Sequence, residues 1–311
     1  MGKKMPEKVH NEPATGRQAP RQILAASSGP SLGMPELSPF PSVAAIKALQ
    51  LASNSEKGLR ELHKLISTDP VFSAELLRAA NSPQYAVRAP VKSTLQATMV
   101  LGYVRLKRLV LTVGLRVSVA KMLEIPVLRA CWRHSLACAI VAEELATARF
   151  AAKSEKGQFL DKDFAFTAGV MHDLGRLALA VMKPKPYADF LNSIADKPCN
   201  ILAKERELIG ADHCQIGRQL VTAWKLPAEF LEITSGHHDD VQNSPFDATA
   251  AVRFGCRMSD SLGFSVAPSE STPSYEELVG ELPEDERQHF GPNREEYARR
   301  IAEKVASIES A

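Results

Sequence analysis

The sequence has few of the features that mark secreted, membrane or disulfide-bonded proteins. No apolar signal core follows the N-terminal Met1, and no later apolar run reaches the length of about 18 residues that a membrane span needs. The five cysteines are odd in number and scattered, and no two of them form a CxxC pair. We therefore expect a cytoplasmic protein with free thiols and no membrane partner.

Signals for β-structure and for a strongly charged surface are also scarce. Aromatic residues make up 6% of the chain, and the net charge is +2 at pH 7. β-Branched residues alternate with polar ones over no useful length, which disfavours a sheet. The basic stretch YVRLKRLVLTVGLR at 103–116 has the pattern of an amphipathic helix whose cations face solvent, so we expect no nucleic-acid partner.

Apolar residues recur at three- and four-residue steps through most of the chain, which predicts an all-α fold. Residues 1–35 are rich in proline, glycine, serine and charge without such a period, and we expect a disordered tail there. Helical segments are predicted over 56–69, 70–81 and 91–117. Asn81 tolerates the left-handed backbone conformation that ends many helices, so the second segment should end there.

The remaining chain divides into a second helical part and a C-terminal extension. Most of the histidines lie between 126 and 265, where the helical pattern continues. After residue 265, a polar linker precedes two further segments, at 274–290 and 293–308. These segments either pack on the body or hang free.

An aspartate stands inside the apolar run FAFTAGVMHDLGRLALAVM at 164–182, which reads as one buried helix. Aspartate is rarely buried unless it is paired or binds a metal. Asp173 therefore has two interpretations, an ion pair with Arg176 three residues on or a metal ligand. The pattern alone leaves both open.

Two further histidines occupy helix positions that suit either a core residue or a ligand. His134 shares an apolar helix face with Cys131 and Cys138, where a buried histidine is common. His213 follows Asp212, a candidate N-cap. A cation is disfavoured at a helix N-terminus, so we expect the neutral imidazole, which is the form that binds metals.

The last candidates are His237 and His238, which end the segment 227–240, and Asp260, which shares a helix face with Cys256 or pairs with Arg257. Five separate segments thus offer donors in the order His, His-Asp, His, His-His, Asp. Imidazole and carboxylate are ligand types of Zn, Mn and Fe sites, and one aspartate can bridge two metals. A metal site is the hypothesis that unites these residues.

The chain resembles a known group of proteins at this point. The order of its donors is similar to the signature of the HD superfamily of metal-dependent phosphohydrolases, with the extra histidines of the HD-GYP branch: His134, His172, Asp173, His213, His237, His238 and Asp260. The stretches LLRAANSP, ATMVLGYVRLKRLVL and WKLP resemble the HDOD domain, the HD-related output domain of bacterial signalling proteins. This likeness extends from about residue 36 to 240.

The resemblance implies an HD-domain-like bundle at 36–265, with an N-terminal helical part at 36–125, an HD-like part at 126–265 and a linker with a helical extension at 266–311. It also implies a divalent transition metal (Mn, Fe or Zn), as one or two ions. One ion would be held by His134, His172, Asp173 and Asp260. The second would be held by Asp173, His213, His237 and His238.

Two functions follow from the resemblance. The HDOD likeness implies a regulatory interaction module in bacterial signal transduction, with signalling proteins as partners. The alternative is an active metal-dependent phosphohydrolase or phosphodiesterase on a nucleotide, in which Asp173 and Arg176 would be the catalytic residues. Arg176 replaces the lysine of the pattern HDxGK and could contact phosphate. No Gly-Tyr-Pro motif follows His238, so we do not expect cleavage of cyclic-di-GMP.

Overall fold

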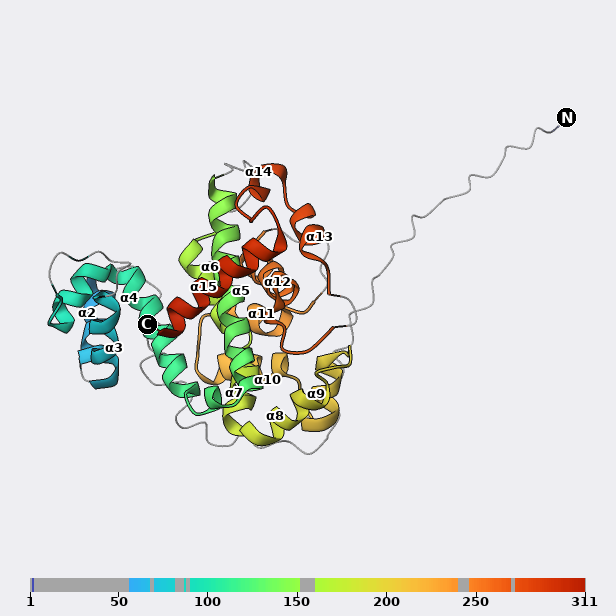
Figure 1. Cartoon of the computed structure of the whole chain (residues 1–311), viewed down its shortest axis with the longest axis horizontal. Coiled ribbons are helices and arrows are strands. Elements are labelled where there is room, and N and C mark those ends of the chain that lie inside the picture. Colours follow the sequence, from blue (N-terminus) through green and yellow to red (C-terminus); the bar gives the residue numbers. More distant parts are fainter. Residues whose placement is uncertain are drawn as a thin grey trace. The chain divides into compact units, whose positions relative to one another are not determined.

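The structure, a computed structural model, describes residues 2, 56–67, 70–81, 87, 90–151, 160–239, 246–269 and 272–310. These residues form helices and turns and include no strand, which confirms the predicted all-α fold. The expected disordered tail at 1–35 lies outside them except for Gly2. In chain order the helices are α2 Glu56–Ser67, α3 Pro70–Ala80, α4 Thr94–Val119, η2 Met122–Glu124, α5 Pro126–Ala151, α6 Lys162–Met171, α7 Leu174–Met182, α8 Pro184–Ser193, α9 Ile201–Ile209, α10 His213–Ala223, α11 Glu229–Gly236, α12 Ala248–Ser259, η3 Asp260–Phe264, α13 Tyr275–Gly280, α14 Glu284–Arg287 and α15 Arg294–Ser310 (Figure 1).

The helices α2, α3 and α4 share a hydrophobic cluster that includes Leu62, Leu76 and Leu106. Helix α3 ends before Asn81, as predicted, but Asn81 does not adopt the left-handed backbone conformation. Among the described residues the only non-glycine with a positive φ is Lys225. Asn81 instead uses its side chain, which accepts a hydrogen bond from Val91 N at 2.7 Å and donates another to Val91 O at 2.9 Å.

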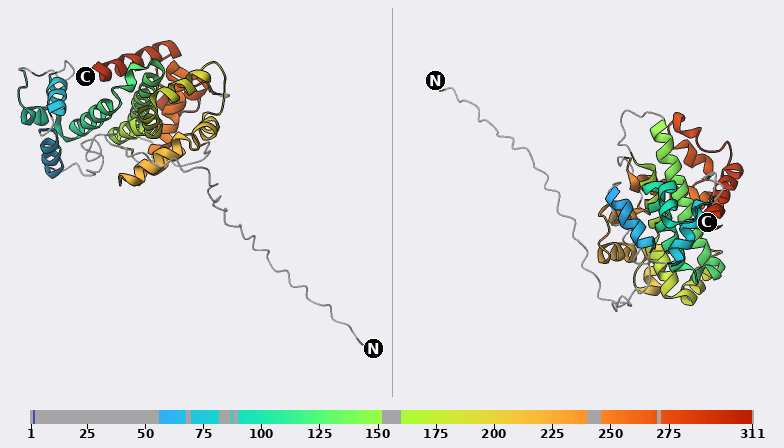
Figure 2. Two further views of the ribbon diagram at one scale, coloured as in Figure 1. Left: turned by 90° about the horizontal axis from the view of Figure 1, so that it is seen from below. Right: turned by 90° about the vertical axis from the view of Figure 1, so that its left-hand side faces the viewer.

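Helix α5 is the centre of the larger hydrophobic cluster. It packs against α6, α12 and α15, and the surrounding helices are visible in Figures 1 and 2. Most of its residues are buried, and many of them are small, which lets the neighbouring helices approach closely. This helix carries His134 into the interior, where His134 is 3% exposed.

The C-terminal segments pack on the body rather than hanging free. The hydroxyl of Tyr297 on α15 donates to Glu144 on α5 at 2.9 Å. Arg149, near the end of α5, donates two hydrogen bonds to Glu286 of α14, at 2.8 and 3.1 Å, and Glu286 is 1% exposed. A buried carboxylate held by two charge-assisted bonds ties this extension to the core.

The run at 164–182 differs from the single helix that its apolar pattern predicts. Helix α6 ends at Met171 and α7 begins at Leu174, so that the break falls at His172 and Asp173. Contrary to the expectation that no apolar stretch is long enough, Lys162–Met182 has the length and hydropathy of a membrane span. In the fold 89% of its apolar window is buried inside the protein, as in a core helix.

Candidate metal centre

The helix break places His172 and Asp173 at the centre of the site. Asp173 has φ −95° and ψ 24°, in the sparsely populated region between helix and strand where active-site residues are often found. His172 is 1% exposed and Asp173 is fully buried. A buried aspartate needs a partner, and the neighbouring helices supply several.

Helix α10 approaches α7 closely enough to bring His213 to Asp173. A Cβ atom at Gly175 would lie 1.9 Å from His213 O, so only glycine permits this contact between the two backbones. Asp212 caps α10 in a capping box with Gln215, as its sequence position predicts. The Nε2 atom of His213 then lies 3.4 Å from Asp173 Oδ1.

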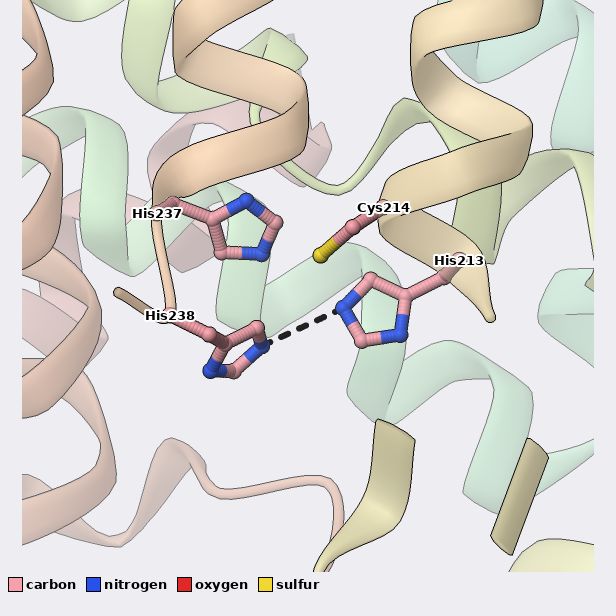
Figure 3. Close-up of side chains that lie close together, drawn as sticks. All are labelled: His213, Cys214, His237 and His238. Atoms are coloured by element: carbon pink, nitrogen blue, oxygen red, sulfur yellow. Dashed lines mark hydrogen bonds between the residues drawn. The ribbon is translucent and has the colours of Figure 1, made fainter. Parts of the chain in front are cut away.

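The end of α11 brings two more imidazoles to the same place. His237 Nε2 lies 3.3 Å from Asp173 Oδ1, and His238 Nε2 lies 3.1 Å from His213 Nε2. Figure 3 shows these three histidines around a common space, with the sulfur of Cys214 beside it. Two segments that are distant from Asp173 in sequence, α10 and the end of α11, therefore converge on it.

The Nε2 atoms of His172 and His237 have no hydrogen-bond partner. His172 Nδ1 lies 2.7 Å from Gly169 O and His237 Nδ1 lies 3.2 Å from Ile233 O. Each Nδ1 can donate to its carbonyl, which leaves a lone pair on each Nε2. Within this group His172 Nε2, His237 Nε2 and Asp173 Oδ1 are buried without a hydrogen-bond partner, whereas Asp173 Oδ2 is paired with Arg176.

His213 is hydrogen-bonded to a buried carboxylate, that of Glu205, which was not among the residues predicted from the sequence. Glu205, on α9, is fully buried. Its Oε2 accepts hydrogen bonds from His213 N at 2.9 Å and from His213 Nδ1 at 2.6 Å, while Tyr187 donates to its Oε1 at 2.7 Å. Such a carboxylate–histidine contact orients the ring and increases its basicity.

The environment sets the charge of each group. Burial lowers the pKa of His172 and His237, so both are neutral at pH 7. Burial alone would raise the pKa of Asp173, but Arg176 and the nearby histidines hold it well below its usual range. Asp173 is therefore an anion beside the neutral imidazoles of His172 and His237.

The expectation that His213 is neutral in the metal-free protein is wrong. Burial and Arg176 lower the pKa of His213, but Glu205 outweighs them and the pKa is raised to about 10. The helix N-terminus was the only influence visible in the sequence, and the contact with a carboxylate overrides it. A metal at Nε2 would replace the proton that this basic ring otherwise binds.

Arg176 provides a cation inside the site. Its Nε lies 2.8 Å from Asp173 Oδ2, and its Nη2 lies 3.1 Å from His213 Nε2. The ion pair that the i, i+3 spacing suggested is therefore present. The other oxygen, Asp173 Oδ1, lies on the side of His213 and His237 and makes no contact with Arg176 in the described part of the chain.

The remaining candidates lie beside this group. The Nδ1 atom of His134 is 3.1 Å from Phe264 O and 3.4 Å from Asp260 Oδ1. Its Nε2 lies 3.5 Å from the sulfur of Cys256. The structure thus places Asp260 and Cys256 at opposite nitrogens of the same ring.

A cavity of about 950 Å³ leads to the cluster. Its lining includes His134, His237 and His238 together with Arg176 and Arg253. Pockets of this size hold small organic ligands. A small molecule as well as an ion can therefore reach His134, His237 and His238.

Comparison with known proteins identifies the family of the chain. The sequence profile of the HDOD domain matches residues 37–240. No protein of curated function matches the chain.

Solved structures share the fold. An HDOD domain protein of unknown function from Geobacter sulfurreducens has 22% identity and a TM-score of 0.63, with 86% of this chain and 90% of that chain covered. A candidate signal transduction protein from Marinobacter aquaeolei VT8 has 22% identity and a TM-score of 0.63, covering 88% of this chain and 58% of that chain. A candidate metal-dependent phosphohydrolase from Shewanella amazonensis SB2B has 17% identity and a TM-score of 0.55, covering 86% and 91%.

Proposed function

Because this chain belongs to the HDOD domain family, we propose that it is a regulatory interaction module of bacterial signal transduction that holds a divalent transition metal. Signalling proteins are its expected partners and the cytoplasm its expected compartment. The metal would sit between α7, α10 and the end of α11, where Asp173 and three histidines face one another. The observation that supports this site most strongly is the spacing of those donors.

Three pairs of these donor atoms are separated as two ligands of one ion are. Two nitrogen or oxygen ligands of a tetrahedral zinc, each at about 2.0–2.1 Å, lie about 3.3–3.4 Å apart. Asp173 Oδ1 lies 3.4 Å from His213 Nε2 and 3.3 Å from His237 Nε2, and His238 Nε2 lies 3.1 Å from His213 Nε2. The unpartnered Asp173 Oδ1 and His237 Nε2 fit the same role.

A metal at this site would serve the module by joining its helices. The donors lie at the start of α7, on α10 and at the end of α11. An ion that binds the folded chain stabilises it in proportion to its affinity. We propose that the metal fixes the relative positions of these helices and thereby the surface that a signalling partner contacts.

The alternative is a metal-dependent phosphohydrolase or phosphodiesterase acting on a nucleotide. The cavity of about 950 Å³ supports it, since His134, His237 and Arg253 all line that cavity. When bound, a divalent metal supplies Lewis-acid polarisation of a phosphoryl group. Asp173 would help to hold the metal, and Arg176 would stay paired with Asp173 or turn towards phosphate.

Turnover assays separate the two functions. Untagged protein loaded with Mn, Fe or Zn is incubated with a panel of nucleotides and phosphodiesters, alongside Asp173→Asn. The interaction module predicts no metal-dependent turnover in either protein. Robust turnover in the wild type that Asp173→Asn abolishes would reject the interaction module and support the hydrolase.

A further inference from the structure

A second group of donors lies next to the proposed metal centre and includes a thiol. His134, His172 and Cys256 come from α5, the α6–α7 junction and α12, and one donor atom of each lies within 4.8 Å of the others. All three residues are buried, at 3%, 1% and 4% exposure. His172 Nε2 has no hydrogen-bond partner, so an imidazole lone pair is available inside the group.

Close packing of α12 on α5 brings the thiol to the histidine. A Cβ atom at Gly255 would lie 2.8 Å from Cys138 O, so this glycine lets the two backbones meet. The next residue, Cys256, then places its sulfur 3.5 Å from His134 Nε2. A nitrogen and a sulfur bound to one tetrahedral zinc, at about 2.05 and 2.3 Å, lie about 3.6 Å apart.

Asp260 lies on the other side of the same ring. His134 Nδ1 faces Phe264 O at 3.1 Å and Asp260 Oδ1 at 3.4 Å. The lone pairs of the two imidazole nitrogens diverge, so an ion on Nε2 is not also on the Asp260 side. In this geometry Asp260 orients the His134 ring through Nδ1, and Cys256 and His172 lie on the side of Nε2.

We infer that His134, His172 and Cys256 form a nitrogen–sulfur site for zinc, beside the metal proposed at Asp173. This inference rests on the proposed function, because it adds a ligand set to that metal centre. The thiol of Cys256 gives its proton to solvent as the metal–sulfur bond forms. A soft thiolate selects zinc over manganese, and three protein ligands leave a fourth position open, towards the cavity that His134 and Cys256 line.

Cobalt spectroscopy tests this assignment, because cobalt(II) substitutes for zinc and a cobalt–thiolate bond gives a near-ultraviolet charge-transfer band. The full chain, without a polyhistidine tag and stripped of metal, is titrated with cobalt(II) while equilibrium dialysis counts the ions bound. The variants are Cys256→Ser, Cys214→Ser and Cys138→Ser. Cys214 lies in the neighbouring histidine group, and Cys138 is a buried thiol whose sulfur donates to Val252 O.

We expect the sulfur band in the wild type, in Cys214→Ser and in Cys138→Ser, and its loss in Cys256→Ser. A band that survives in Cys256→Ser, or that only Cys214→Ser removes, overturns the inference. Cobalt bound without any sulfur band in the wild type overturns it but leaves the metal centre at Asp173 standing. No bound cobalt at all rejects both. If Cys256→Ser does not fold, a wild type without a sulfur band, or a band that Cys214→Ser or Cys138→Ser removes, still overturns the inference.

Discussion

Replacing Glu205 by glutamine removes the charge behind His213 while keeping the shape of the side chain. Glu205 is fully buried and accepts three hydrogen bonds, from Tyr187 and from two nitrogens of His213. Bonds to a charged group contribute about 1.5–3 kcal/mol each and neutral ones about 0.5–1.5 kcal/mol. Weakening three such bonds by about 1 kcal/mol each should lower the free energy of unfolding by about 3 kcal/mol.

A matched control lies on the same helix. Glu207 is exposed and pairs only with Lys204, at 2.8 Å, so Glu207→Gln should change stability little. Urea denaturation of the metal-free proteins measures the difference. Zinc affinity, measured by competition with a chelator, should fall about 10- to 100-fold in Glu205→Gln and remain unchanged in Glu207→Gln. Equal stability and equal zinc affinity in the two variants would refute the role given to Glu205.

The same pair predicts a dependence on pH. Burial raises the pKa of the Glu205 carboxyl, but His213 and its hydrogen bond outweigh burial. The pKa is therefore lowered from 4.5 to about 2. A lowered carboxyl pKa stabilises the fold above pH 4.5, and this contribution is lost as the pH falls towards 2. His213, raised from 6.5 to about 10, stabilises below pH 6.5 and loses that contribution as the pH rises towards 10. The gap between wild type and Glu205→Gln should therefore be widest between pH 4.5 and 6.5.

Three other substitutions test separate parts of the account. Gly175→Ala should lose about 1–3 kcal/mol in urea denaturation because its Cβ would overlap His213 O, whereas Gly280→Ala, whose Cβ meets nothing, should not be destabilised. Arg176→Met leaves Asp173 without its cation and should destabilise the metal-free protein by about 3 kcal/mol. Zinc should then raise the Tm of this variant more than the Tm of the wild type. An equal rise in the two proteins would contradict the pairing of Arg176 with Asp173. Glu286→Ala should release residues 272–310 from α5, so trypsin should cleave that segment faster than in the wild type. Resistance to trypsin equal to that of the wild type would disprove this.

The helical fold could be predicted because each helix has its own apolar period. The expected boundaries near Pro70 and Asn81 agree with α3, and Ser93 caps α4. The helix break at His172 and Asp173 was missed, since both sides of it are equally apolar. Hydropathy reports burial, and it does not report where a backbone turns.

The site was predicted only in part, for a similar reason. The donors around Asp173 could be named because their order resembles a known family, although they come from helices far apart in sequence. Glu205 gave no such signal, because a glutamate in the polar segment ILAKERELI looks like a solvated residue. Cys256 looked like a small core residue. Only the packing of α9 and α12 shows that these two side chains point at histidines.

Metal analysis by mass spectrometry shows whether the chain holds an ion at Asp173. Untagged wild-type protein is compared with Asp173→Ala and His237→Ala, and the folding of each is checked by its thermal melt. We predict Zn, Mn or Fe near stoichiometry in the wild type and loss of the metal in both variants. Three metal-free proteins of equal stability would contradict it, and the histidines would then be packing residues of a helical scaffold.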